Sequence, residues 1–131
     1  MSTQVVYDFA EAINSQNAEE VAGLMTEDHI FIDAHNNQVK GKETMKSGWA
    51  MYFQWFPDYK IEIEEIYTNG DSIAAFGFAS GTFKNIKAPD NKNYWRLPAA
   101  WKAVVEKGKI KLWQVYADTK IPFDIIESNK K

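Results

Sequence analysis

The spacing of apolar residues divides the chain into a helical first part and a second part made of strands. Phe9 and Ile13 lie about one helical turn apart, and the pattern around them predicts an amphipathic helix over about residues 3–14. Asn17 is followed at the third position by Glu20, a capping-box pattern that opens a second, short helix. Two helices are therefore expected before any strand.

A short apolar strand over residues 29–34 follows, and then a turn at Asn36-Asn37. A third helix is predicted over residues 42–56, where Pro57 ends it because the proline ring cannot continue a helix. This helix carries an aromatic stripe made of Trp49, Tyr52, Phe53 and Phe56.

After Pro57 the pattern is typical of antiparallel strands. Residues 60–67 alternate but slip phase by one residue, which indicates a bulge that bends the sheet. Asn69-Gly70 is a strong hairpin signal. The next strand, residues 72–83, is apolar or small on both faces, which indicates that both faces are covered.

Two long strands are predicted over residues 94–106 and 109–119, after a polar loop at 84–93. An apolar tail over 121–126 is expected to dock as a short terminal element. The pattern predicts an α+β domain, with three N-terminal helices packed on a strongly curved, mainly antiparallel sheet that encloses a pocket.

Composition narrows the function classes. The 131 residues fit one domain spanning 1–131, and the net charge of −3 without a basic stripe argues against nucleic acid. The absence of cysteine excludes disulfides and thiol chemistry, and the two histidines form no metal-ligand motif. We expect no metal, no cofactor, no membrane span and a cytoplasmic location, since no signal-peptide pattern is present.

Six short motifs are spread along nearly the whole chain. They are Phe9-Ala10-Glu11-Ala12-Ile13-Asn14, Leu24-Met25-Thr26-Glu27-Asp28, Phe31-Ile32-Asp33, Val39-Lys40-Gly41-Lys42-Glu43, Gly81-Thr82-Phe83 and Trp113-Gln114-Val115-Tyr116-Ala117-Asp118. Their order and spacing resemble the SnoaL-like division of the nuclear transport factor 2-like superfamily. The resemblance implies a cone-shaped fold, a cavity between helices and sheet, and a homodimer formed through the outer sheet face.

Asp33 is the first candidate catalytic residue. The resemblance to ketosteroid isomerases implies a general base near this position, and an apolar cavity would raise the pKa of the carboxyl. The alternative is a solvated aspartate that ends a strand. His35 could share the face of Asp33 and move protons, or be a loop residue, whereas His29 is predicted to be a surface group.

A steroid isomerase is nevertheless disfavoured. The resemblance places Phe9 and Ala100 where those enzymes hold hydrogen-bond donors for an oxyanion, and neither side chain can donate. Each missing donor costs about 3–4 kcal/mol of transition-state stabilisation.

Asp118 is the second candidate acid, in the position where similar cyclases and epoxide hydrolases carry an aspartate. Simple alternation would place it with Tyr116, Gln114 and Leu112 on one strand face, which is predicted to be a cavity wall. The alternative is that Asp118 only ends the strand. The hydrolases also need an arginine, and Arg96 is the only arginine.

Two functions therefore stay open. One is cofactor-independent acid–base catalysis, of a cyclase, isomerase or hydrolase kind, on a small apolar or aromatic molecule. In it Asp33 or Asp118 would take the proton, with His35 and Tyr116 in support. The other is a non-catalytic module that binds such a molecule or associates with a protein. Core packing and ligand contact are both open for the candidate ligand-binding residues, namely Trp49, Tyr52, Phe53, Phe56, Phe78, Trp101, Gln114 and Leu112.

Overall fold

The computed structural model describes residues 2–85 and 92–130, so most of the predicted loop at 84–93 lies outside the described residues. The helices and strands follow one another as α1 (Ser2–Asn14), α2 (Ala18–Gly23), β1 (Met25–Ile32), β2 (Gln38–Lys40), α3 (Lys42–Trp55), β3 (Lys60–Asn69), β4 (Ser72–Thr82), the 3₁₀ turn η1 (Phe83–Asn85), β5 (Tyr94–Glu106), β6 (Lys109–Ala117) and α4 (Lys120–Ser128).

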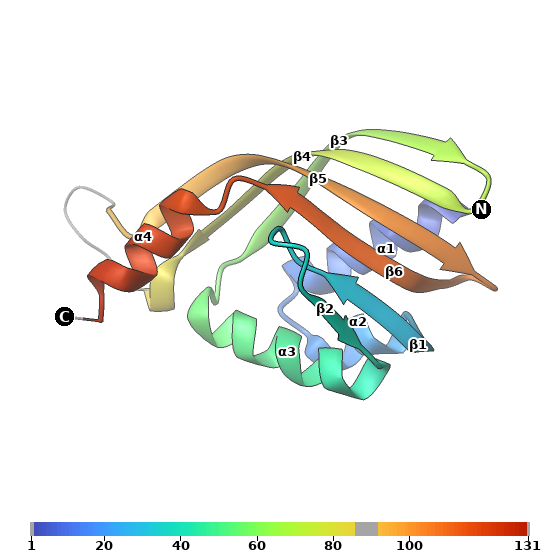
Figure 1. The fold of residues 1–131 in the computed structure, drawn as a ribbon, viewed down its shortest axis with the longest axis horizontal. Helices are drawn as coiled ribbons and strands as arrows, with labels where there is room; N and C mark the ends of the chain where they lie inside the picture. The colour runs from blue at the N-terminus through green and yellow to red at the C-terminus, as the bar shows by residue number, and fades with distance from the viewer. Residues whose placement is uncertain (1, 86–91, 131) are drawn as a thin grey trace.

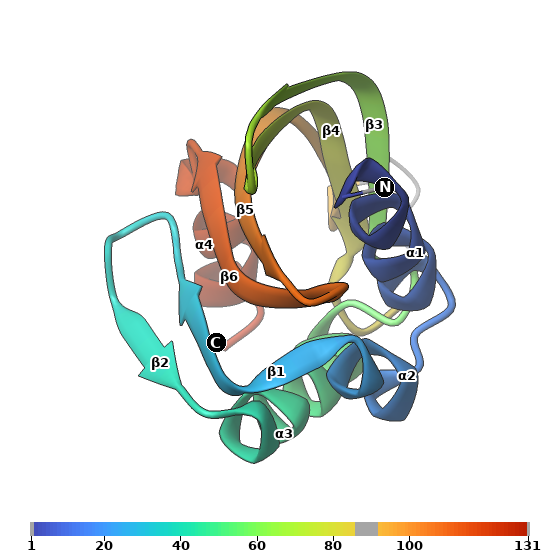
Figure 2. The same cartoon turned by 90° about the vertical axis from the view of Figure 1, so that its right-hand side faces the viewer.

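The strands form one sheet in the order β2-β1-β6-β5-β4-β3. Strands β3 to β6 are a meander of hairpins, as predicted, and β1 joins it by pairing in parallel with β6. Figure 2 shows the strong curl of this sheet, with α1, α2 and α3 on its concave side. In Figure 1, α4 lies across one end of the sheet.

Several local features of the structure follow from short sequence patterns. The Asn17 side chain accepts a hydrogen bond from the backbone N–H of Glu20, which confirms the predicted cap of α2. The predicted bulge lies between Ile63 and Glu65 of β3. Opposite it, a Cβ atom on Gly77 would lie only 1.7 Å from the carbonyl oxygen of Glu62, so only glycine allows this close approach of the two strands.

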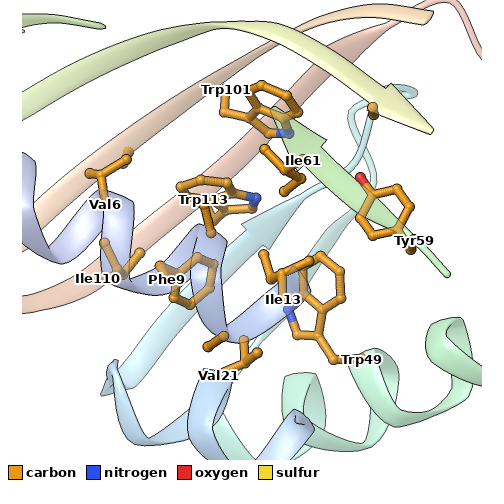
Figure 3. Packing of buried hydrophobic residues seen from close by; sticks show 14 of the residues in the cluster. Val6, Phe9, Ile13, Val21, Trp49, Tyr59, Ile61, Trp101, Ile110 and Trp113 are labelled. Atoms are coloured by element: carbon orange, nitrogen blue, oxygen red, sulfur yellow. The ribbon is translucent and has the colours of Figure 1, made fainter. Parts of the chain in front are cut away.

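Large aromatic residues fill the core between α1 and the sheet (Figure 3). The rings of Trp101 and Trp113 stack with centroids 6.4 Å apart, and Phe9 packs on Trp113 at 4.8 Å. All three side chains are buried. Rings of this size supply much of the apolar area that stabilises a small domain.

His29 is a buried core residue, so the prediction of a surface group is wrong. Its ring Nδ1 lies 2.8 Å from the carbonyl oxygen of Ile110, and its side chain packs near Phe9. The local sequence hides this because β1 is covered through its parallel pairing with β6, a contact between distant parts of the chain. Among the described residues, no helix is long and apolar enough to cross a membrane.

Candidate ligand-binding site

A small apolar cavity of about 80 Å³ lies between α3, the concave face of β4 to β6, and α4. Its lining consists of Tyr52, Trp55, Phe56, Tyr59, Ala79, Trp95, Leu97, Ala99, Val115, Ala117, Thr119, Pro122, Phe123 and Ile126. None of these side chains carries a formal charge, which suits a ligand with an apolar surface.

Small side chains on the sheet leave the space for this cavity. Ala79, Ala99 and Ala117 come from the three neighbouring strands β4, β5 and β6, and all three belong to the lining. Ala99 pairs directly with Ala117 across the β5–β6 ladder. Because an alanine projects only one carbon from the sheet, the facing helices cannot close the gap completely.

The turn that follows α3 holds two of the aromatic walls. The backbone N–H of Tyr59 donates to the carbonyl oxygen of Phe56 at 3.0 Å. Asp58, between them, accepts hydrogen bonds from the backbone and hydroxyl of Thr82, each at 2.7 Å. The side chain of Gln16 donates to the carbonyl oxygen of Tyr59, so the turn after α3 is fastened both to β4 and to the turn that follows α1.

Both tyrosines of the cavity are neutral phenols at ordinary pH. Burial raises the pKa of Tyr52 well above its usual range, and a repulsion between this group and Tyr59 adds to the effect. Burial also raises the pKa of Tyr59. The cavity therefore carries no phenolate charge.

Helix α4 closes one side of the cavity, and His35 holds its first turn. The His35 ring Nε2 lies 2.8 Å from the hydroxyl oxygen of Thr119. The same ring stacks on Phe123, with centroids 5.4 Å apart and an angle of 12° between the planes. Thr119 and Phe123 both line the cavity, so His35 lies at its edge.

Asp33 caps the turn that carries His35. Its carboxylate accepts hydrogen bonds from the backbone N–H groups of His35 and Asn37, each at 2.9 Å, and from the Asn37 amide. Partial burial acts to raise the pKa of Asp33, but these hydrogen bonds outweigh it and hold the pKa below its usual range. The predicted rise of this pKa is therefore wrong, and the carboxylate is a weak base.

The predicted cavity wall on the last strand is displaced by one residue. The β5–β6 register shifts at Lys111, so Ile110 and Trp113 both point into the core. Val115 and Ala117 then face the cavity, and the residues expected there, Leu112, Gln114, Tyr116 and Asp118, lie outside its lining. Tyr116 is about half exposed on the opposite face, and the Asp118 carboxylate accepts a hydrogen bond from the backbone of Lys120 at the start of α4.

The candidate ligand-binding aromatics divide into three groups. Tyr52 and Phe56 line the cavity. Trp49, Phe53 and Trp101 are buried in the core and do not line the cavity. Phe78 lies on the outer sheet face, where the Arg96 guanidinium covers its ring at 3.8 Å and pairs with Glu62.

Phe9 and Ala100, the two positions that the resemblance aligns with the oxyanion donors of ketosteroid isomerases, lie in different parts of the structure. Phe9 is fully buried against Trp113. Ala100 pairs with Tyr116 on the outer face, and its neighbour Ala99 faces the cavity in its place. Neither alanine can donate a hydrogen bond, so no donor is supplied from this strand position.

Several lining residues were missed from sequence. Trp55, Tyr59 and Phe123 were not candidates, and the three small floor residues were not singled out. One available signal was the alanine at inward-facing positions of neighbouring strands, which only the correct strand phase reveals. Within residues 2–85 and 92–130, no three His, Asp or Glu side chains gather as a metal site.

The match to the SnoaL-like domain model covers residues 6–113. The chain belongs to this family. No curated protein matches it.

Solved structures share this fold at low sequence identity. A proposed SnoaL-like polyketide cyclase from Shewanella denitrificans OS-217 is 12% identical with a TM-score of 0.80, covering 97% of both chains. An epoxide hydrolase of the LEH-like kind from M. tuberculosis is 13% identical with a TM-score of 0.78, covering 97% of this chain and 90% of the other. A protein with a ketosteroid isomerase-like fold from Catenulispora acidiphila DSM 44928, in complex with trimethylamine, is 19% identical with a TM-score of 0.75, covering 86% of this chain and 83% of the other.

Proposed function

We propose that this SnoaL-like domain binds a small, mainly apolar molecule in the cavity between α3, the sheet and α4. The observation that carries the proposal is the cavity itself, an uncharged space walled by aromatic rings over an alanine floor. Apolar clefts with a few polar groups are the usual form of small-molecule sites.

The volume of the cavity limits the ligand. Pockets for drug-sized molecules measure about 300–1,000 Å³. A cavity of about 80 Å³ holds much less, so a polyketide-sized substrate does not fit while α4 is in this position. The Catenulispora acidiphila structure holds trimethylamine, which supports a small ligand for a domain of this fold.

Filling the floor tests the proposal. Ala99→Leu places a larger side chain in the cavity, and we expect it to abolish binding of the neutral probe 3,3-dimethyl-1-butanol, measured by calorimetry or tryptophan fluorescence. The matched control is Ala100→Leu, the adjacent residue on the outer face, which should leave binding intact. If the probe binds equally to both variants, it does not occupy this cavity.

A catalytic role would centre on His35, because its ring lies at the cavity edge and an imidazole can both accept and donate a proton. We propose it as the proton carrier of an acid–base reaction, with Asp33 holding its loop through the backbone of His35. Retention of full turnover by His35→Gln would contradict this role.

We also propose a homodimer formed through the outer sheet face. Phe76, Tyr67 and Tyr116 lie there with 43%, 57% and 52% of their surfaces exposed. The rings of Tyr67 and Phe76 contact each other, with centroids 6.0 Å apart. An exposed apolar patch on a sheet commonly marks an association surface.

The predicted cytoplasmic location remains a prediction.

A further inference from the structure

Four rings of the cavity lining form a closed circuit of contacts. The centroid distances are 5.2 Å for Tyr52–Phe56, 5.4 Å for Phe56–Trp95, 6.0 Å for Trp95–Tyr59 and 4.9 Å for Tyr59–Tyr52. Neighbouring planes are inclined by 44° to 88°. The two pairs inclined by nearly 90° are edge-to-face contacts, and all four rings belong to the cavity lining, so together they form one continuous aromatic wall. Trp55 extends this wall, 6.3 Å from Tyr52.

The electrostatics of this circuit favour a cation. The face of an aromatic ring is negative, and a cation within about 6 Å of a ring centroid is attracted to it. Among the residues that the structure describes, no lysine or arginine lines the cavity to repel a cation, and both tyrosines are neutral. An anion in the cavity would meet the negative faces of the rings and find no positively charged side chain in the described part of the lining.

Few hydrogen-bonding groups line the cavity, and this determines which kind of cation it favours. A primary ammonium that enters must replace its hydrogen bonds to water, and an unreplaced bond costs several kcal/mol in an apolar site. The side-chain hydroxyls of the lining come from Tyr52, Tyr59 and Thr119, and Thr119 already contacts His35. A methylated nitrogen has few or no N–H groups to satisfy, and its methyl groups can pack against the rings.

Size agrees with this class of ligand. An apolar cavity of about 150 Å³ holds benzene. The volume here is about half of that, at about 80 Å³, which limits the part of the ligand inside the cavity to one compact group. A trimethylammonium head is such a group, and the rest of its molecule can extend past Trp55 and Phe123, which are both partly exposed.

We propose that the aromatic circuit Tyr52-Phe56-Trp95-Tyr59 binds a methylated ammonium group, of the kind carried by choline. The inference rests on the binding function proposed above and names its ligand class.

The test compares choline with 3,3-dimethyl-1-butanol, which has the same shape with carbon in place of the charged nitrogen. Calorimetric titration should show choline binding roughly 5-fold or more tightly than the neutral compound. Tyr59→Leu and Trp55→Leu each remove one ring and should reduce this preference. Trp55 is partly exposed, so its variant is informative even if the buried Tyr59 is needed for folding. The control is Tyr7→Leu, an exposed ring on α1 outside the lining.

The outcomes separate the two proposals. Equal or tighter binding of the neutral compound, blocked by Ala99→Leu, overturns the ammonium inference and leaves the binding function standing. A choline preference that is unchanged in both ring variants also overturns the inference. If neither compound binds to the folded protein, the ammonium inference and the proposed binding function both fail.

Discussion

At the scale of single residues, the two histidines have opposite surroundings. His29 donates from Nδ1 to the carbonyl oxygen of Ile110, and no partner for its buried Nε2 exists within the described ranges. Burial lowers the pKa of His29, although the hydrogen bond to Ile110 and the charge of Asp28 partly oppose this effect. His35 is exposed at the edge of the cavity.

His29 should make stability depend on pH. The folded pKa is below the ordinary value of about 6.5, so the full contribution is present above that pH. As pH falls below about 6.5, the unfolded chain binds a proton that the folded chain does not, and the free energy of unfolding decreases by up to about 1.4 kcal/mol per pH unit.

Urea denaturation between about pH 5 and 8 measures this slope, and acidic groups titrate mostly below that window. His29→Gln should remove the slope and His35→Gln should keep it. A wild-type curve that is flat below about pH 6.5 would contradict the burial of a neutral His29.

Asp33 should stabilise the turn that carries His35 and Asn37, and should not act as a catalytic base. Asp33→Asn removes one of the two carboxylate oxygens that accept hydrogen bonds and turns an amide N–H₂ toward Asn37, so we expect a loss of about 1 kcal/mol in the free energy of unfolding. Asp118→Asn keeps an oxygen for Lys120 and should cost less. If Asp33→Asn instead abolished a turnover at unchanged stability, Asp33 would be the catalytic base after all.

At the scale of elements, α4 is fastened at both ends. Its first turn is held by the His35–Thr119 contact and the Phe123 stack, and its own residues Pro122 and Ile125 are buried. At the other end, the Asn129 side chain donates to that of Asn93 at 2.9 Å. The helix therefore closes the cavity through a small number of contacts.

Removing the His35 ring should loosen this helix. In His35→Ala, we expect faster hydrogen exchange at the amides of Phe123 and Ile126 and no change in α1, because the Thr119 contact and the stack are both lost. Lys120→Ala, which removes only an exposed pair with Asp124, is the control. Equal exchange in the two variants would show that His35 does not hold α4.

The sequence predicted elements whose signals are local, and missed features that depend on distant pairing. The cap at Asn17 and the bulge near Ile63 lie within a few residues of their cause. The bulge at Lys111 appears only when β6 is aligned with β5, and it moved the predicted cavity wall to the wrong residues. The burial of His29 depends in the same way on β1 joining β6.

At the scale of the whole molecule, the concave face of the sheet is covered by helices, and the outer face presents exposed rings. Light scattering should therefore give the mass of a dimer. Phe76→Lys, at the centre of the proposed contact, should give a monomer, because a charge would be buried there. Lys102→Ala on the same face is a milder control. A monomeric wild-type protein would contradict the dimer.

We expect this domain to bind its ligand in the space between α3, the alanine floor and α4. Methyl NMR of alanine-labelled protein, titrated with choline and with 3,3-dimethyl-1-butanol, tests it most directly. We expect at least one compound to shift the signals of Ala79, Ala99 and Ala117 and to leave those of Ala74 and Ala100, on the outer face, unchanged. Shifts confined to the outer-face alanines, or none with either compound at millimolar concentration, would contradict it.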